Sequence, residues 1–205
     1  MTQMDSARDT ESDERLLRAF AAGDDAALAE LARRYERSLL GLARGLLGGD
    51  DLAREATQDA WVRVIRFAGR FDGRSSFKTW VYRIVINQCR DIRRKTRRRG
   101  HEPRRQHSWP EPVQGTSHAA GATGQESCGG HGAAGLAERE RQATLRDAVA
   151  RLPNDRRTLI LLCYHDGVSH ADAAEILRIP LGTVKSRLHA ALAELRAALT
   201  EREWP

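Results

Sequence analysis

Cationic side chains gather between residues 90 and 105, near the middle of the chain. The run contains Arg90, Arg93, Arg94, Lys95, Arg97, Arg98, Arg99, Arg104 and Arg105. Two acidic residues, Asp91 and Glu102, lie among these cations. Cations at this density repel one another unless a polyanion neutralises them, so the run predicts contact with nucleic acid.

Aromatic residues directly precede this basic run and alternate with cations. The aromatic residues are Phe71, Phe77, Trp80 and Tyr82, and the cations are Arg74, Lys78 and Arg83. Aromatic rings stack on unpaired bases while cations follow the phosphate backbone, so the stretch is typical of single-strand binding. The spacing of Phe77 and Trp80 also fits core positions of a helix. The polar loop from Asp72 to Ser76 is therefore the better candidate for a pocket that receives a flipped base.

The C-terminal part of the chain has the pattern of a helix-turn-helix. Ser169, followed by Asp172, predicts the capped start of a short helix that ends near Leu177. A second helix is expected over residues 183–199. Its buried stripe consists of Val184, Leu188, Ala191, Leu195 and Ala198. Arg178 stands where such turns often have a left-handed glycine, a conformation that arginine adopts at a cost.

Polar side chains of that second helix lie away from its buried stripe. Ser186 and His189 are opposite the stripe, and Lys185 and Arg187 lie at its flanks. The major groove of DNA admits one such helix, and lysine or arginine can reach bases or phosphates from it. A solvated basic surface is the alternative interpretation, but the preceding helix and turn favour DNA contact.

Enzymatic chemistry finds little support in the acidic residues. A nuclease or recombinase needs convergent carboxylates or a nucleophile with its base. The adjacent pairs Asp24 with Asp25 and Asp50 with Asp51 point to different sides of a helix, so helix capping explains them more economically. We therefore expect a protein that is not an enzyme.

Histidine and cysteine residues are the remaining candidates for ligand chemistry. Those near the middle of the chain are His101, His107, His118, Cys128 and His131. None of their spacings matches a zinc finger, so we expect no metal and no cofactor. Together with Cys89 and Cys163 the cysteines number three, and this odd count predicts free thiols.

Composition places the chain among cytoplasmic proteins with a basic balance. Its 205 residues carry a formal net charge of +6, and no apolar stretch reaches the roughly 18 residues of a membrane span. The acid-rich N-terminus lacks the basic head and apolar centre of a secretory signal. We therefore expect a cytoplasmic location without membrane insertion.

Glycine and proline divide the sequence into two helical domains. Residues 100–135 hold 8 of the 17 glycines and predict a flexible linker. The domains are expected over 23–99 and 136–200, with a flexible N-terminus and the start of the first helix over 1–22 and a tail over 201–205. No alternation of period two predicts a sheet, so the fold class is all-α.

Individual helices follow from the apolar periodicity and the breakers. In chain order they are expected over residues 24–47, from 50 or 51 to 67, from 75 or 76 into the basic run, and over 136–150, 155–164, 169–177 and 183–199. Gly48 and Gly49 end the first of these helices. Asp50 or Asp51 is expected to cap the second.

Two long strings resemble one family. LAREATQDAWVRVIRFAGRFDGRSSFKTWVYRIVINQCRDIRR, residues 52–94, resembles region two of bacterial RNA polymerase sigma factors of the extracytoplasmic-function (ECF, group IV) class in the sigma-70 family. LRDAVARLPNDRRTLILLCYHDGVSHADAAEILRIPLGTVKSRLHAALAELRAAL, residues 145–199, resembles region four of the same class. The resemblance implies two small helical domains, a region-two bundle and a region-four helix-turn-helix, joined by a flexible linker.

The resemblance implies a docking surface for the polymerase core on the helix over residues 51–67. Family members place this helix on the clamp helices of the beta-prime subunit, and the beta flap is a further core partner. The matching candidates are Gln58, Asp59, Trp61 and Arg63. Simple core packing explains Trp61 equally well.

Two DNA-reading surfaces are also implied. Candidates for the minus-ten element are Ser75, Ser76, Lys78, Trp80, Arg83, Asn87, Arg90, Asp91 and Arg94. Candidates for the minus-thirty-five element are Thr183, Lys185, Ser186, Arg187 and His189. In the family the first surface separates the strands and holds a base, for which Asn87 offers both a donor and an acceptor.

The predicted function is therefore that of an ECF sigma factor. Such a protein binds core polymerase, directs it to specific promoters, melts the minus-ten region, and is regulated by an anti-sigma factor. The alternative is a helix-turn-helix regulator that does not join the polymerase, whose N-terminal half should carry a ligand pocket or a phospho-acceptor. That half carries the aromatic and basic strip instead. A nucleic-acid enzyme is the less favoured alternative.

Overall fold

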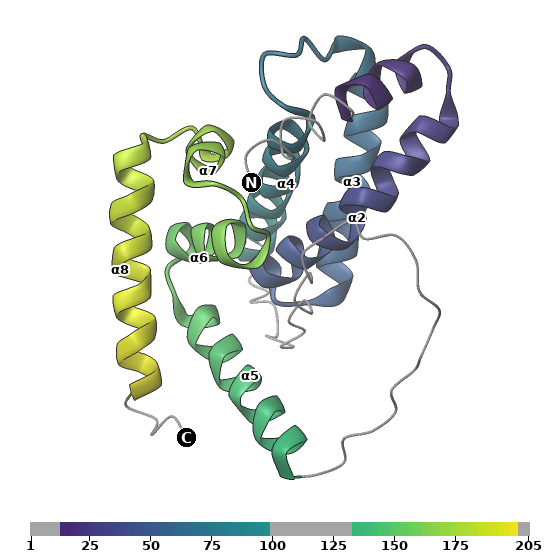
Figure 1. Ribbon diagram of the computed structural model, residues 1–205. Helices are drawn as coiled ribbons and strands as arrows, with labels where there is room; N and C mark the ends of the chain where they lie inside the picture. The colour runs from purple at the N-terminus through teal and green to yellow at the C-terminus, as the bar shows by residue number, and fades with distance from the viewer. Residues whose placement is uncertain (1–12, 99–132, 201–205) are drawn as a thin grey trace.

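The computed structural model describes residues 13–98 and 133–200, and no strand occurs within these two ranges. Figure 1 shows the helices in chain order. They are a helical segment over residues 13–21, α2 (Asp25–Leu47), α3 (Asp50–Phe67), the 3-10 turn η1 (Ala68–Arg70), α4 (Phe77–Arg98), α5 (Ala133–Arg151), α6 (Asn154–Ile160), the π-helical turn η2 (Leu161–His165), α7 (His170–Leu177) and α8 (Leu181–Thr200). The all-α fold expected from the sequence is confirmed.

Helices α2, α3 and α4 pack against one another as a first group (Figure 1). Leu31 and Leu42 of α2 and Phe77 and Val81 of α4 are fully buried in its core. The face that α3 turns to this core is built from alanines such as Ala60, whose small side chains let the backbones approach. Burial of one such leucine or phenylalanine contributes about 1.5–3 kcal/mol, whereas an exposed ion pair contributes about 0–1 kcal/mol. The apolar core therefore dominates the stability of this group.

Gly48 and Gly49 form the connection from α2 to α3. Asp24 caps α2 by accepting a hydrogen bond from the Ala26 main chain, and Gly48 ends the helix in a left-handed conformation. The expected aspartate cap of α3 is wrong, because Gly49 holds the capping position without a side-chain hydrogen bond. Asp50 and its neighbour Asp51 lie inside the first turn of α3, where negative charge favours the helix dipole.

Other helix boundaries differ from expectation by a few residues. Residues 13–21 lie in the segment 1–22, for which a flexible N-terminus and the start of the first helix were expected, and they form a separate packed helical segment in which Leu17 is 1% exposed. Helix α5 begins at Ala133, inside the expected linker, and the single helix expected over 155–164 is divided into α6 and η2. Helix α8 begins at Leu181, because the turn closes when the Thr183 amide donates to Pro180.

Helices α5 to α8 form a second group that contains the expected helix-turn-helix. Ser169 Oγ accepts a hydrogen bond from the Asp172 amide at 3.1 Å, so the predicted cap of α7 is confirmed. The expected buried stripe of α8 is also present, with Val184 and Leu188 at its start. Within the described residues, Arg178 is the one non-glycine residue with positive φ, and it ends α7 in the left-handed conformation that its position predicted.

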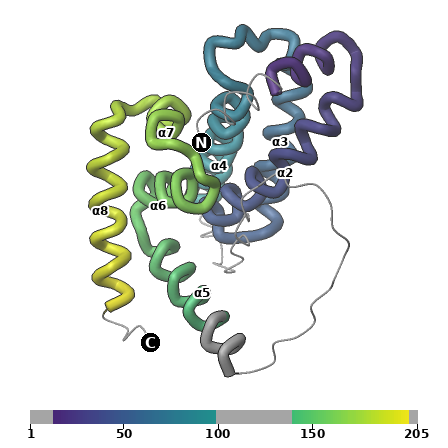
Figure 2. Tube along the Cα trace, viewed as in Figure 1, coloured from purple at the N-terminus to yellow at the C-terminus, as the bar shows by residue number. Residues whose placement is uncertain are grey.

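The two groups pack against each other, with α7 beside α4 (Figure 2). Arg83 of α4 donates to the main-chain oxygens of Glu175 and Ile176 at the end of α7, at 2.8 and 3.4 Å. On the other side of the contact, α2 meets η2 at Gly45. A Cβ atom on Gly45 would lie 2.7 Å from Cδ1 of Leu161, which is fully buried. A side chain at position 45 would therefore force Leu161 to move.

The left-handed backbone at Arg178 yields a stability prediction. The left-handed conformation costs an L-residue about 1–2 kcal/mol, and glycine avoids this steric cost. Glycine loses more chain entropy on folding, however, which costs about 0.5–1 kcal/mol. We expect Arg178→Gly to raise the free energy of unfolding by about 0.5–1 kcal/mol, measured from urea unfolding curves. Arg196→Gly, in the interior of α8, is the matched control and should lower it by about 1 kcal/mol. Equal losses for the two variants would contradict the account.

The contact at Gly45 yields a second prediction. Gly45→Leu places four carbon atoms where the Leu161 side chain already lies, so we expect the two groups to separate although α2 itself gains helix propensity. The expected result is a larger radius of gyration by small-angle X-ray scattering and a loss of about 1–3 kcal/mol in unfolding free energy. Gly69→Leu is the control, because nothing lies within 4 Å of a Cβ at that position. An unchanged radius for Gly45→Leu would overturn the assignment.

Candidate nucleic-acid interface

A strip of polar side chains runs along the exposed side of α4. Arg83, Asn87, Arg90 and Arg94 recur at intervals of four, three and four residues, which places them on one face of the helix. The opposite face is fixed in the core by residues such as Val85. Burial of one face therefore directs this strip, called the α4 strip below, away from the core of the first group, with Arg83 turned toward α7.

Weak contacts orient the cations of the α4 strip. Arg90 donates to Asn87 Oδ1 at 3.4 Å, and Arg94 pairs with Asp91 at 3.0 Å. These groups are largely exposed, and exposed ion pairs contribute about 0–1 kcal/mol. The cations can therefore exchange these partners for phosphate oxygens at little cost. Asn87 is exposed and retains its amide donors for a base edge.

The loop before α4 is held by local hydrogen bonds. Asp72 accepts from the Arg74 amide at 3.1 Å, and Gly73 supplies the positive φ that this turn needs. Ser76 Oγ accepts from the Thr79 amide at 3.1 Å and so caps α4. The side chain of Ser76, a predicted minus-ten residue, thus serves as the N-cap of α4. Ser75 is half-buried in the same loop.

Aromatic rings pack beside this loop. Phe71 and Trp80 lie 5.3 Å apart between ring centroids, and Phe77 and Trp80 lie 6.2 Å apart. Phe77 is fully buried, which confirms the core interpretation for that ring, whereas Trp80 is half-buried at the edge of the cluster. Trp80 is therefore the ring of this cluster on α4 with surface left for stacking on a base.

Two other minus-ten candidates on α4 face the second group instead of solvent. Arg83 bonds to the end of α7, where carbonyl groups attract a cation, and burial together with the charge of Arg178 lowers the pKa of Arg83 from its usual value. The charge of Lys78 affects the buried carboxyl group of Asp166. Burial raises the pKa of Asp166, while the hydrogen bond from His165 at 2.7 Å and the positive charge of Lys78 lower it. In this arrangement Asn87, Arg90 and Arg94 remain accessible.

The four candidates on α3 divide into an exposed set and one packed residue. Gln58, Asp59 and Arg63 are exposed. Trp61 is half-buried against the core, and its indole nitrogen donates to Glu36 of α2. Packing against the core therefore explains why tryptophan occupies position 61, without a contact to a partner protein.

Sequence reasoning missed two apolar residues on the same helix. Val62 is 55% exposed and Ile65 is 50% exposed, next to the polar candidates. Their signal in the sequence is that they fall outside the alanine and valine stripe that α3 buries. The two side chains add apolar surface to the exposed side of α3 that carries the polar candidates.

Helix α8 presents its minus-thirty-five candidates as the sequence predicted. Lys185, Ser186 and His189 are exposed, and Ser186 Oγ also donates to the Thr183 main-chain oxygen at 3.1 Å. Arg187 lies at the flank, with its Nε 3.5 Å from the carboxylate of Asp155 on α6. This pairing orients the guanidinium while leaving 39% of the side chain exposed. Thr183 itself is half-buried.

Metal-binding clusters and cysteine reactivity can be assessed in the described residues. Within 13–98 and 133–200, no group of three or more His, Cys, Asp and Glu side chains is placed to hold a metal ion. Burial raises the pKa of Cys89 to about 12 and that of Cys163 to about 11, so both thiols stay protonated and weakly nucleophilic at neutral pH. The five His and Cys candidates between residues 101 and 131 lie outside the described residues. Among the helices that the structure describes, none has the length and apolar character needed to cross a membrane.

Family comparisons cover both helical groups. The family described as "Sigma-70 region 2" matches residues 31–99, and "Sigma-70, region 4" matches residues 135–195. The first match contains α3, α4 and most of α2, and the second contains the helix-turn-helix. Both regions therefore occur in the order that the sequence resemblance implied.

Relatives along the whole chain agree with this match. The chain is 33% identical to the ECF RNA polymerase sigma factor SigM of Mycobacterium tuberculosis strain H37Rv, over 94% of this chain and 87% of the relative. It is 29% identical to the RNA polymerase sigma-H factor of Pseudomonas aeruginosa, over 92% and 94% of the two chains. SigW of Bacillus subtilis strain 168, an ECF RNA polymerase sigma factor, is 30% identical over 87% and 92%.

Solved structures share the fold across both groups. CnrH, solved in complex with the cytosolic domain of CnrY, superposes with a TM-score of 0.66 at 22% identity, over 93% of this chain and 98% of that one. RpoE of Bartonella quintana, solved with the anti-sigma factor NepR, gives 0.60 at 21% identity, over 84% and 96%. The sequence match to SigM, the two region matches and this shared fold lead to one conclusion: the chain belongs to the ECF sigma factors of the sigma-70 family, regulatory factors of promoter-directed transcription initiation by RNA polymerase.

Proposed function

We propose that this chain binds core RNA polymerase in the cytoplasm, directs it to particular promoters, and opens the minus-ten region. The observation that carries the proposal is the α4 strip, which presents Asn87, Arg90 and Arg94 on the same helix as the half-buried Trp80, seven residues before Asn87. Cations along a helix follow a phosphate backbone, an amide reads a base edge, and a half-exposed ring stacks on a base. These are the groups that single-strand capture requires.

Strand opening is driven by binding energy in this proposal. Unstacking costs a few kcal/mol per base step, and binding interactions must offset this cost. Stacking on Trp80, contacts of phosphates with Arg90 and Arg94, and the attachment of the whole complex to DNA provide the compensation. The free chain is therefore a weak DNA binder compared with the polymerase complex.

Helix α8 reads the minus-thirty-five element in this proposal. Lys185, Ser186 and His189 extend toward the major groove, and Arg187, oriented by Asp155, reaches a base edge or a phosphate. The preceding helix α7 sets the angle of α8 through the turn at Arg178. Duplex recognition and strand opening thus belong to different helices.

The exposed face of α3 docks on the beta-prime clamp helices. Gln58, Asp59 and Arg63 supply polar contacts around Val62 and Ile65, whose apolar surface is buried on docking. The beta flap is the further core contact that we propose. Trp61 supports this face from beneath through its bond to Glu36.

An anti-sigma factor is the regulator that we propose. Two solved proteins of the same fold, CnrH and RpoE, are bound to CnrY and to the anti-sigma factor NepR respectively. In the present chain, α7 already holds Arg83 of the α4 strip. A partner that favours this packing of the two groups withholds part of the minus-ten surface, and release of α7 from α4 returns it.

Run-off transcription tests the proposal as a whole. Core polymerase is incubated alone or with the full chain on fragments of the source genome. We expect promoter-specific transcripts only with the chain present. Unchanged output from an active core preparation would overturn the proposal and favour a DNA-binding regulator outside the polymerase.

Variants on a promoter found in this way separate the two DNA surfaces. Arg187→Ala should weaken initial duplex binding by the complex about tenfold, as expected for a lost base or phosphate contact. Asn87→Ala should slow opening more than binding, and a template already melted at the minus-ten element should restore it. Arg139→Ala removes an exposed arginine of α5 and is the matched control. Equal rescue of both variants by the melted template contradicts this division.

The apolar patch on α3 predicts the strength of core binding. We expect Val62→Ser with Ile65→Ser to weaken the affinity for core polymerase about tenfold or more, since each side chain loses about 1–2 kcal/mol of apolar burial. Fluorescence anisotropy of labelled chain titrated with core measures the change. Leu192→Ser, a comparably exposed position on α8, should leave the affinity unchanged. Undiminished binding by the double variant would exclude this face as the docking surface.

A further inference from the structure

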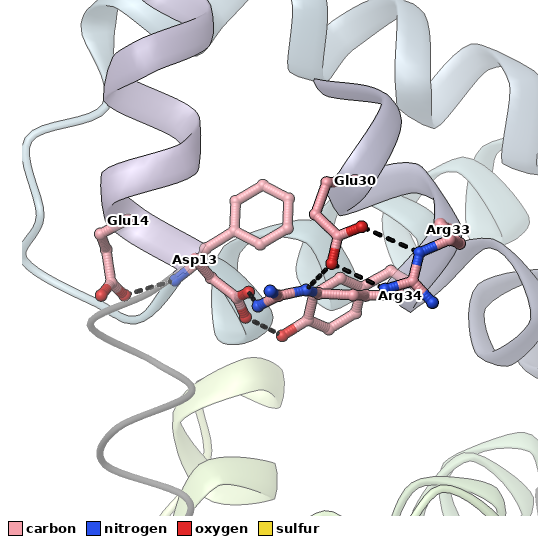
Figure 3. Close-up of polar contacts among 7 residues, drawn as sticks. Asp13, Glu14, Glu30, Arg33 and Arg34 are labelled. Carbon is pink, nitrogen blue, oxygen red and sulfur yellow. Dashed lines mark hydrogen bonds and ion pairs between the residues drawn. The ribbon is translucent and has the colours of Figure 1, made fainter. Parts of the chain in front are cut away.

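The first turn of the N-terminal helical segment touches the start of α4. Glu14 Oε1 accepts a hydrogen bond from the Phe77 amide at 3.0 Å, across 63 residues of sequence (Figure 3). Phe77 is the first residue of α4, so its amide has no partner inside the helix. Ser76 satisfies the Thr79 amide two residues later. The start of α4 is thus capped from two distant parts of the chain.

Asp13 reaches the same residue by a second route. Its carboxylate is 3% exposed, and it accepts hydrogen bonds from Arg34 Nη1 at 2.7 Å and from the Tyr35 hydroxyl (Figure 3). The Tyr35 ring meets the Phe77 ring edge to face, with centroids 5.3 Å apart. Glu14 therefore holds the Phe77 main chain, while Asp13 holds the tyrosine against which the Phe77 ring packs.

The turn that carries these two carboxylates is itself well anchored. Leu17, one helical turn later, is buried in the core of the first group. Arg34 is held from its other side by Glu30 at 2.7 Å, and hydrogen bonds from Arg33 and Arg34 lower the pKa of Glu30 to about 2 (Figure 3). Glu30 therefore remains a carboxylate at neutral pH and keeps Arg34 directed toward Asp13. The carboxylates of Asp13 and Glu14 are therefore held in place and can fix the position of the start of α4.

Phe77 directly follows the loop over residues 72–76, which is the proposed pocket for a flipped base. The hydrogen bond between Asp72 and the Arg74 amide fixes the start of this loop. The hydrogen bond between Glu14 and the Phe77 amide fixes the residue that follows its end. Trp80, the ring proposed to stack on a base, lies one turn further along α4 and packs on Phe77. A shift of Phe77 displaces both the loop and this ring.

We propose that Glu14 is a positioning residue for strand opening, which holds the base-capturing loop and Trp80 in place through the Phe77 amide. The inference rests on the proposed function. It extends that function to Glu14, which lies far along the sequence from every residue proposed to contact DNA. A loop already ordered before capture spares the complex the entropy of ordering it afterwards. The carboxylate acts through its acceptor oxygen, so glutamine at this position retains the effect and alanine does not.

The test compares Glu14→Ala, Glu14→Gln and the control Glu140→Ala, which removes the same side chain from an exposed position of α5. Permanganate reactivity of unpaired thymines reports opening of a promoter identified by run-off transcription, with full-length chain and core polymerase. We expect Glu14→Ala to lower the open fraction about fivefold, the order of a lost neutral hydrogen bond, with Glu14→Gln and Glu140→Ala within about twofold of the parent. A template melted at the minus-ten element should restore Glu14→Ala, and its affinity for core should be unchanged.

Amide hydrogen exchange of the full chain provides a readout that does not depend on transcription. We expect faster exchange at Phe77 in Glu14→Ala and parental exchange in Glu14→Gln, with far-ultraviolet circular dichroism confirming that both variants are folded. Parental exchange in Glu14→Ala, or faster exchange with undiminished opening, overturns the positioning role while the proposed function stands. A parent chain that opens no promoter, although Glu14→Ala exchanges faster, overturns the proposed function and leaves the capping contact in place.

Discussion

Burial of one face of α4 is the constraint on which the rest of the structure depends. Phe77, Val81 and Val85 are fully enclosed, and their transfer from water supplies several kcal/mol to the first group. Because an α-helix turns once every 3.6 residues, fixing this stripe also fixes the direction of every other side chain on the helix. The side chains of Asn87, Arg90 and Arg94 therefore extend from the helix toward solvent, while Arg83 of the same strip contacts α7.

The same helix also joins the two groups. Arg83 belongs to the α4 strip, yet its guanidinium satisfies carbonyl oxygens at the end of α7, and Gly45 lets α2 approach η2 closely on the other side. Contact with α7 and contact with a phosphate draw on the same donors of Arg83. The packing of the groups and the accessibility of the strip are thereby coupled through one side chain.

The charged groups of the described residues divide into exposed cations and a few buried carboxylates. The cations lie on surfaces where water and counterions reduce the repulsion between them. Release of counterions when a polyanion binds favours association. The charged groups that are buried have local tasks: Asp13 orders Tyr35, and Asp166 pairs with His165 where η2 ends. Membership in the ECF sigma factors is consistent with this division, since such a subunit acts by selective binding on a polymerase that performs the reaction.

The sequence alone determined the features that arise within a few residues of one another. The helical class, the Ser169 cap, the left-handed Arg178 and the outward direction of Lys185 and His189 all follow from local periodicity and backbone sterics. Tertiary structure decided the rest: that Arg83 contacts the end of α7, that Ile65 stays exposed with Val62, and that Glu14 caps α4. These outcomes depend on which distant segments meet. A pattern along the chain specifies which face of a helix is apolar, but the partner that covers that face, or fails to, is chosen only when the helices pack.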